Sequence, residues 1–328
     1  MDKMSDVKLV KQLTKTRDQF NAEISKRVLG QQEIIDHILI ALLCKGHTLL
    51  VGVPGLAKTL LIKSIAELLD LNFSRIQFTP DLMPSDITGT EIIEEDQNSG
   101  KREFRFFKGP IFGNIILADE INRTPPKTQA ALLEAMQEHG VTTAGQTYVL
   151  EEPFFVLATQ NPIEQEGTYP LPEAQLDRFM FNIKIDYPSH EDEVSIVKST
   201  TSEDDKKLNT IINRKDLILY QDLVRRVPIA DNVVDFAVEL VSKTRPKSDK
   251  SSSAIKDWID WGAGPRASQY LVLGAKAKAI LDGRPAPEID DIKALAKPVL
   301  RHRLITNFNA EAEGLSTDDI LIKLLEEG

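Results

Sequence analysis

Cysteine is almost absent from this sequence. The chain of 328 residues has one, Cys44, so no disulfide can form within it. Because Cys44 lies in an apolar run, we expect a buried thiol in a reducing compartment rather than a reactive nucleophile. A hydrophobic run long enough to cross a membrane and a signal-peptide core are also missing. The sequence therefore predicts a cytoplasmic protein with no membrane insertion.

An excess of basic residues is missing as well. The chain has 50 acidic and 40 basic residues, a net charge of −10, which on average repels nucleic acid and anionic membranes. Its 5 histidines are scattered, and no cluster has the spacing of metal ligands. Hydrophobic residues make up 41% of the chain, enough for a buried core. The length predicts two domains, or one large domain with an appendage.

A glycine-containing turn is the most informative feature that is present. In residues 49–59 an apolar strand runs into this turn, which ends in Lys58-Thr59 and opens a helix. Backbone N–H groups and the positive end of such a helix bind phosphate, while the lysine adds charge and the threonine a hydroxyl for magnesium. The strict pattern has glycine where Ala57 stands, and a methyl group fits there if φ is negative. An ordinary turn is the alternative.

A pair of acids follows about sixty residues later. Residues 114–118 are mostly apolar and lead directly to Asp119 and Glu120. A buried parallel strand would place these acids at its carboxyl end, where open α/β sheets bind ligands. Asp119 would belong to the Mg²⁺ shell and Glu120 would polarise the attacking water. The alternative is a strand that simply leaves the core.

The order of apolar segments predicts the architecture. Strands are expected at 47–53, 73–79, 114–119, 153–159 and 181–185, with helices between several of them, so the fold class is α/β with a doubly wound parallel sheet. Hairpin-like inserts are expected at 85–108 and 140–152. Helical periods replace strands after Pro188, and residues 245–253 look like a flexible loop. We expect a nucleotide-binding domain over 1–189 and a smaller all-helical domain over 190–328.

Five motifs in order resemble the MoxR family of AAA+ ATPases, within the clade that carries an insert in its second helix. The resemblance covers about residues 25–305, and its motifs span residues 52–59, 119–127, 158–162, 171–179 and 264–268. It implies a P-loop NTPase domain followed by a helical lid. Ala57 is what the family is expected to show, whereas Gly264 stands where the family more often has serine.

The family's roles transfer residue by residue. The resemblance implies catalytic roles for Lys58, Glu120, Asn161, Arg178 and Arg266. It implies that ATP is bound by Gly52, Val53, Pro54, Gly55, Leu56, Ala57, Lys58, Thr59, Leu60 and Arg266, and Mg²⁺ by Thr59 and Asp119.

Two of these roles have alternatives, and the role of Arg123 is open. Asn161 matches sensor one, which holds the attacking water or the γ-phosphate, but Asn-Pro is also a common turn. Arg178 matches the arginine finger, which acts on a neighbouring subunit's nucleotide; a salt bridge with Asp177 or Glu173 is the alternative. Arg266 matches sensor two and reaches the γ-phosphate of its own subunit. Arg123 is either a second contact between subunits or a solvent-facing residue.

The resemblance also implies partners. A finger that acts in trans requires a closed homo-oligomeric ring, which we expect to be a hexamer. The expected activity is chaperone-like remodelling or activation of a protein client, in this family often one with a von Willebrand A domain. A motor acting on nucleic acid is disfavoured, because the 140–152 insert has no lysine or arginine, although the first insert has Lys101, Arg102, Arg105 and Lys108. A binding switch with little turnover is the other alternative. A GTPase is not expected, since no Asn-Lys-x-Asp run is found.

Overall fold

The structure is a computed structural model that describes residues 5–95, 102–143, 145–164, 167–201 and 206–326. The chain divides into two compact units. One, which we call the α/β unit, comprises residues 49–172 and 184–214, and the other, the helical unit, comprises residues 1–48, 173–183 and 215–328. Each is described by itself, and the predicted domain boundary near residue 190 stays a prediction.

A five-stranded sheet has the order β2–β5–β8–β1–β9. β5 pairs in parallel with β2 on one side and with β8 on the other. The strands follow the sequence expectations within a few residues: β1 (His47–Val51), β2 (Phe73–Gln77), β5 (Ile115–Asp119), β8 (Phe155–Gln160) and β9 (Phe179–Lys184). The predicted α/β class with a parallel sheet is confirmed.

Strand β5 is buried because its residues are apolar on both faces. Ile115, Ile116, Leu117 and Ala118 are each 0% exposed, as expected for a parallel strand covered by helices. Helices connect the strands: α3 (Lys58–Leu68) follows β1, and α5 (Pro126–Glu138) lies between β5 and β8. Such crossover helices connect strands that run in the same direction. The carboxyl ends of β1, β5 and β8 therefore lie at one edge of the sheet.

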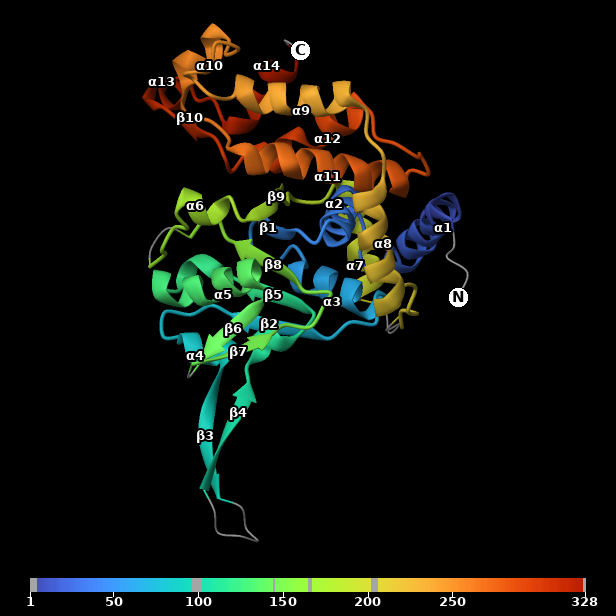
Figure 1. Cartoon of the computed structure of the whole chain (residues 1–328), viewed down its shortest axis with the longest axis vertical. Helices are drawn as coiled ribbons and strands as arrows, with labels where there is room; N and C mark the ends of the chain where they lie inside the picture. The colour runs from blue at the N-terminus through green and yellow to red at the C-terminus, as the bar shows by residue number, and fades with distance from the viewer. Residues whose placement is uncertain (1–4, 96–101, 144, 165–166, 202–205, 327–328) are drawn as a thin grey trace. The chain divides into compact units, whose positions relative to one another are not determined.

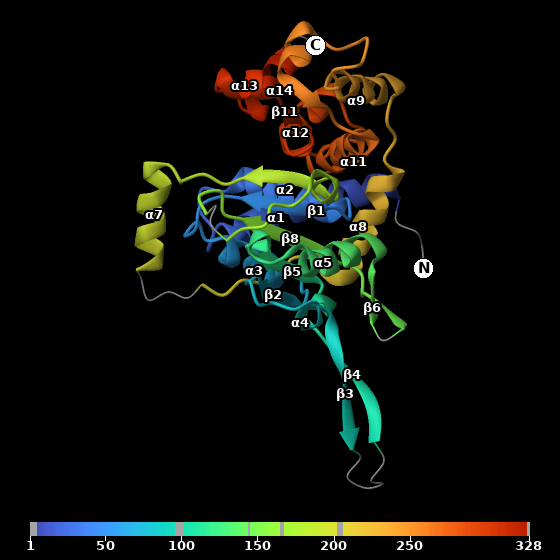
Figure 2. The ribbon, with the colours of Figure 1, turned by 90° about the vertical axis from the view of Figure 1, so that its left-hand side faces the viewer.

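Two hairpins interrupt the alternation of strands and helices. The first follows α4 (Pro84–Thr88) and consists of β3 (Gly89–Glu95) and β4 (Arg102–Lys108), an antiparallel ribbon that extends away from the rest of the α/β unit (Figures 1 and 2). The second consists of β6 (Gly140–Thr143) and β7 (Gln146–Val149). Of the predicted insert residues, 96–101 and Ala144 lie outside the described residues.

Aromatic rings join the two hairpins. The rings of Phe106 on β4 and Tyr148 on β7 stack with their centroids 4.2 Å apart and an interplanar angle of 19°. Phe112, in the short 3₁₀ helix η1 (Pro110–Phe112), packs edge-on against Phe106 at 5.8 Å. Beyond this contact the ribbon carries exposed apolar side chains, among them Phe104, which is 74% exposed. A second 3₁₀ helix, η2 (Ile121–Arg123), follows β5.

The helical unit is built mainly from helices. Around α11 (Pro265–Leu281) pack α1 (Asp6–Ile24), α2 (Gln32–Leu43), α9 (Asp231–Lys243) and α12 (Ile289–Leu300). Gly274 of α11 permits this packing, since a Cβ atom there would lie 2.7 Å from Leu295 Cδ1. A short ribbon that the sequence did not predict pairs β10 (Ile259–Trp261) with β11 (Ile305–Thr306).

The remaining helices complete the described chain. They are α6 (Glu173–Leu176), α7 (His190–Thr200), α8 (Arg214–Arg226), α10 (Ser253–Trp258), α13 (Phe308–Ala312) and α14 (Thr317–Glu326). Cys44 is buried, as expected, and burial raises the pKa of its thiol well above the usual value. Among the described residues no helix is long and apolar enough to cross a membrane. Residues 245–250 form a turn that Arg245 fastens to the carbonyl oxygen of Ala263 at 2.9 Å.

Candidate nucleotide site

The predicted phosphate loop connects β1 to α3 in the α/β unit. Gly52 follows β1, and a Cβ atom there would lie 2.0 Å from the side chain of Ile185, so only glycine fits. Gly55 has φ of +87°, which glycine adopts without strain. The loop then enters α3 at Lys58, and Ala57 at its start makes no side-chain cap hydrogen bond. The first N–H groups of a helix lack partners within the helix, so this helix start can bind an anion. The local geometry is that of an anion-binding turn.

Ala57 differs from the sequence expectation. Its φ is +54° and its ψ is 25°, a left-handed conformation, so the negative φ that would make room for the methyl group is not found. The left-handed conformation costs an L-residue about 1–2 kcal/mol, whereas glycine adopts it freely. The left-handed backbone at this position explains why the strict pattern has glycine here. The Ala57 side chain is exposed, so its methyl group meets no neighbouring side chain that would exclude it.

Lys58 bends back over the loop. Its ammonium group donates a hydrogen bond to the carbonyl oxygen of Gly52. Burial lowers the pKa of Lys58, while the nearby carboxylates of Asp119 and Glu120 act in the opposite direction. A partly buried cation that faces the loop suits an anionic ligand, because a phosphate would replace the lost hydration.

Asp119 and Glu120 stand at the carboxyl end of β5, as predicted. Thr159 on β8, which is 1% exposed, binds both residues: its hydroxyl donates to Asp119 Oδ1 at 2.6 Å and accepts from the Glu120 N–H at 2.9 Å. Glu120 has φ of +57°, which turns its side chain away from the line of the strand. Thr159 therefore fixes the orientation of both acids.

Two polar residues of β2, which sequence reasoning missed, hold the other oxygens of the acidic pair. Arg75 donates to Asp119 Oδ2 at 2.6 and 3.2 Å and to Gln77 Oε1 at 2.6 Å. Gln77 in turn donates to Glu120 Oε2 at 3.0 Å. Arg75 and Gln77 are alternate residues of one strand and share a face. Long polar side chains at alternate positions of one strand were the available signal.

Asn161 and Arg123 lie near the acids. Asn161 is 6% exposed, and its side-chain oxygen accepts from the N–H of Ile163 at 3.1 Å, so it forms the turn that was the alternative interpretation. Within the described residues its amide NH₂ makes no further hydrogen bond, which leaves that donor for a ligand. Arg123 pairs with Glu164 at 2.5 Å and with Glu120 at 3.3 Å.

A cavity of about 410 Å³ brings most of these residues together. It is lined by Pro54, Gly55, Leu56, Ala57, Lys58, Thr59, Arg75, Asp119, Glu120 and Asn161. Of the predicted nucleotide-binding residues in this unit, Gly52, Val53 and Leu60 are not part of the lining. Nine of the lining residues were predicted from the sequence, and Arg75 is the addition.

The cavity's oxygen donors fit a magnesium ion that arrives with a nucleotide. Among the described residues no group of three or more acidic, histidine or cysteine side chains could hold a metal alone. Mg²⁺ in nucleotide sites keeps several waters and takes one or two protein oxygens besides the phosphates. The Thr59 hydroxyl and the Asp119 carboxylate supply two such oxygens.

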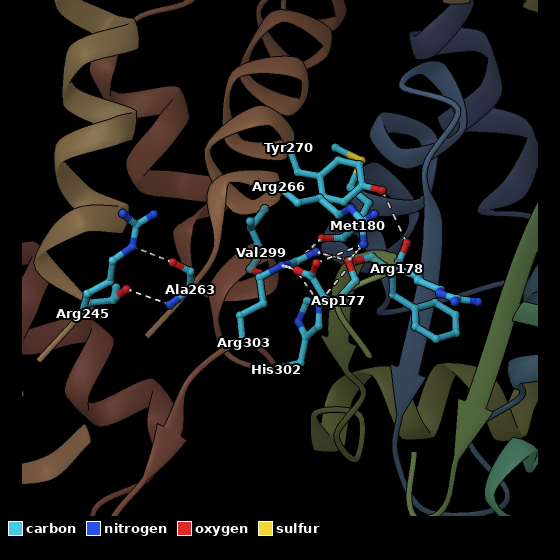
Figure 3. A network of polar contacts seen from close by, with 12 residues as sticks. Asp177, Arg178, Met180, Arg245, Ala263, Arg266, Tyr270, Val299, His302 and Arg303 are labelled. Carbon is cyan, nitrogen blue, oxygen red and sulfur yellow. Dashed lines mark hydrogen bonds and ion pairs between the residues drawn. The ribbon is translucent and has the colours of Figure 1, made fainter. Parts of the chain in front are cut away.

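Arg178 and Arg266, the other predicted catalytic residues, belong to the helical unit. Arg266, at the start of α11, forms an ion pair with Asp177 Oδ2 at 3.0 Å (Figure 3). The alternative for Arg178, a salt bridge with Asp177 or Glu173, is not found: its guanidinium makes no ion pair with any residue that the structure describes. Asp177 is instead bound by Arg303, which the sequence did not reveal.

Comparison with known proteins agrees with this geometry. Residues 47–181 match the family model of the "ATPase family associated with various cellular activities (AAA)", and residues 251–324 match an AAA lid domain. The chain is 42% identical to Chaperone MoxR1 of Mycobacterium tuberculosis, over 93% of this chain and 79% of that protein. It is 30% identical to Protein MoxR of Paracoccus denitrificans, over 86% of each chain.

A solved structure is similar throughout. A candidate ATPase from Cytophaga hutchinsonii superposes with a TM-score of 0.91 at 42% identity, and the match covers 98% of this chain and 96% of that one. The parallel sheet, the phosphate loop and the acidic pair define an AAA+ ATPase with a lid domain. Within that class, the chain belongs to the MoxR family.

Proposed function

We propose that this ATPase works as a homo-oligomeric ring in which Mg²⁺-dependent ATP hydrolysis drives the remodelling of a protein partner. One observation carries the proposal: the phosphate loop, both acids and Asn161 line one cavity. This arrangement offers an anion-binding helix end, oxygen ligands for a metal and a base beside the same space. Such a set serves hydrolysis, whereas a binding switch has no use for a base.

The residues of the α/β unit divide the chemistry among them. The loop N–H groups and Lys58 bind the phosphates, and Asn161 donates its amide to the γ-phosphate or the water. Thr59 and Asp119 would hold the magnesium ion, which would supply positive charge opposite the phosphates. Glu120 accepts a proton from the attacking water, while its Oε2 atom keeps the hydrogen bond from Gln77.

Two arginines complete the proposed site. Arg266 reaches the γ-phosphate of its own subunit, and Arg178 reaches the nucleotide of a neighbour, which makes a closed ring necessary. We infer a hexamer. The support from this chain is that the Arg178 guanidinium has no ion-pair partner among the described residues, so it is free to act outside its own subunit.

The proposed output is chaperone-like activation or assembly of a protein client in the cytoplasm. The support comes from the relative named Chaperone MoxR1. A client with a von Willebrand A domain is the candidate that the family resemblance implies.

A motor acting on nucleic acid has less support. In its described residues the β6–β7 hairpin has no lysine or arginine. On the β3–β4 ribbon Arg105 is paired with Glu94 at 3.0 Å, and Lys108 lies 5.1 Å from the centroid of the Phe112 ring. Cations with these partners are less available to phosphates than free ones.

A mixing experiment tests the proposal. Arg178→Ala keeps Glu120, and Glu120→Gln keeps Arg178, so each variant alone should hydrolyse ATP at least tenfold more slowly than the wild type. Mixed before assembly, they form rings in which a Glu120→Gln subunit supplies its intact arginine to a neighbour's intact site. Hydrolysis should then rise above that of either variant, as measured by phosphate release per subunit.

The matched control mixes Arg178→Ala with the double variant that carries both changes. This mixture contains no subunit with an intact arginine finger beside an intact base, so no recovery is expected. Equal rates in the two mixtures would contradict the action of Arg178 between subunits. A Glu120→Gln variant with wild-type turnover would contradict the assignment of the base.

A further inference from the structure

Asp177 is shared by two arginines of the helical unit. Arg303 Nε donates to Asp177 Oδ1 at 2.7 Å, and Arg266 Nη1 donates to Asp177 Oδ2 at 3.0 Å (Figure 3). Asp177 immediately precedes Arg178, in the link between α6 and β9. One carboxylate therefore joins the proposed sensor arginine to the segment that carries the proposed arginine finger.

Arg303 is an immobile partner. Its side chain is 2% exposed, and its guanidinium also donates to the backbone oxygens of Asp177 at 3.0 Å and Phe179 at 2.7 Å. The ring of Tyr270 covers this guanidinium at 5.3 Å, and the Tyr270 hydroxyl donates to the Arg178 carbonyl oxygen at 3.4 Å. A buried guanidinium with so many acceptors is costly to displace, because each lost bond would leave a buried donor unpaired.

Arg266 is held much more weakly. Its side chain is 40% exposed, and its partners among the described residues are the Asp177 carboxylate and, at 3.5 Å, the Asp177 carbonyl oxygen. A partly exposed ion pair contributes at most about 1 kcal/mol, so the guanidinium can leave it at small cost. Asp177 stays in place through Arg303 when Arg266 departs. The carboxylate is thus a fixed acceptor with an exchangeable donor.

We propose that Asp177 sets the preference for ATP over ADP by holding Arg266 whenever no γ-phosphate is present. The inference rests on the role of Arg266 proposed above. ATP must take Arg266 away from Asp177, and the cost of breaking that pair subtracts from ATP affinity. ADP has no γ-phosphate to attract Arg266, so the pair stays intact and ADP affinity is unaffected.

Asp177→Asn tests this competition. The asparagine oxygen still accepts the hydrogen bond from Arg303, but Arg266 loses its charged partner. We expect ATPγS to bind about threefold more tightly and ADP to bind unchanged, as measured by equilibrium titration of fluorescent nucleotides with Mg²⁺. In an Arg266→Ala background, Asp177→Asn should leave both affinities unchanged, because the competitor is gone.

A matched control is Asp36→Asn. Asp36 pairs with Arg17 at 3.0 Å in the same unit and is similarly exposed, and this variant should bind both nucleotides as the wild type does. If Asp177→Asn does not fold, Asp177→Glu replaces it. The glutamate keeps the charge opposite Arg303 but displaces the carboxylate from Arg266, so the preference for ATPγS should again rise.

The outcomes separate the two proposals. An unchanged ratio of ATPγS to ADP affinity in the Asp177 variant would overturn the inference, as would an equal change in the Arg266→Ala background. In either case the proposed ATPase function would stand, because the wild type would still bind nucleotide. A wild-type chain that bound neither nucleotide would refute the proposed function and the inference with it.

Discussion

Thr159→Val removes one hydroxyl from the centre of the site. The side chain keeps its shape, but Asp119 Oδ1 loses a donor at 2.6 Å and the Glu120 N–H loses an acceptor at 2.9 Å. A hydrogen bond to a carboxylate is worth about 1.5–3 kcal/mol and one between neutral groups about 1 kcal/mol. The added methyl group returns about 1 kcal/mol through burial. We therefore expect a net destabilisation of about 1.5–3 kcal/mol.

Activity should fall as well, since the hydroxyl orients both acids. A loss of at least tenfold in kcat is expected, because a small displacement of a base or a metal ligand is enough to cost that much. Urea unfolding followed by circular dichroism measures the first effect, and steady-state phosphate release measures the second. Nucleotide binding in EDTA should change little, because the phosphate loop keeps its contacts.

Thr48→Val is the matched control. Thr48 is also a buried strand threonine, at 0% exposed, but its hydroxyl has no hydrogen-bond partner among the described residues. Its replacement should leave stability unchanged or raise it, and should leave turnover unchanged. If Thr159→Val unfolded at the same urea concentration as Thr48→Val and hydrolysed ATP at the wild-type rate, the role given to the Thr159 hydroxyl would be refuted.

Two further predictions concern the same cavity. Arg75→Gln should tighten Mn²⁺ binding in the presence of ATPγS about threefold, because it removes a cation from Asp119 Oδ2. Electron paramagnetic resonance of Mn²⁺ measures the affinity. Unchanged affinity would show that Arg75 and the metal do not compete for Asp119. Ala57→Gly should raise the free energy of unfolding by about 0.5–1 kcal/mol. Glycine removes the strain of the left-handed conformation, and this gain exceeds the extra backbone entropy that glycine loses on folding. A urea midpoint below that of the wild type would contradict this prediction.

Much of the fold was predictable because its signals are local. Most strands of the sheet contain a short apolar run, and the phosphate loop and the acids each occupy consecutive residues. The conformation of Ala57 was not predictable from the motif, because the pattern gives residue types and not φ. The pairing of β10 with β11 was not predicted for a different reason, because strands of two and three residues are too short to show a periodic pattern.

The missed contacts are those between distant segments. Arg75 contacts Asp119 because the sheet order places β2 beside β5. The sequences of the two strands do not by themselves predict that they are neighbours. Arg303 binds Asp177 across 126 positions of sequence, and an isolated arginine near the end of a helix usually faces solvent. The assignments of Arg178 and Arg266 came from the family resemblance, and their action on a nucleotide stays a prediction.

The stacked rings of Phe106 and Tyr148 have a mechanical consequence. Each hairpin alone is a two-stranded ribbon, which is flexible about its base. The stacking interaction couples one insert to the other close to the base of each hairpin. A force applied to the β3–β4 ribbon is therefore transmitted in part to β7, so the two hairpins move together rather than independently.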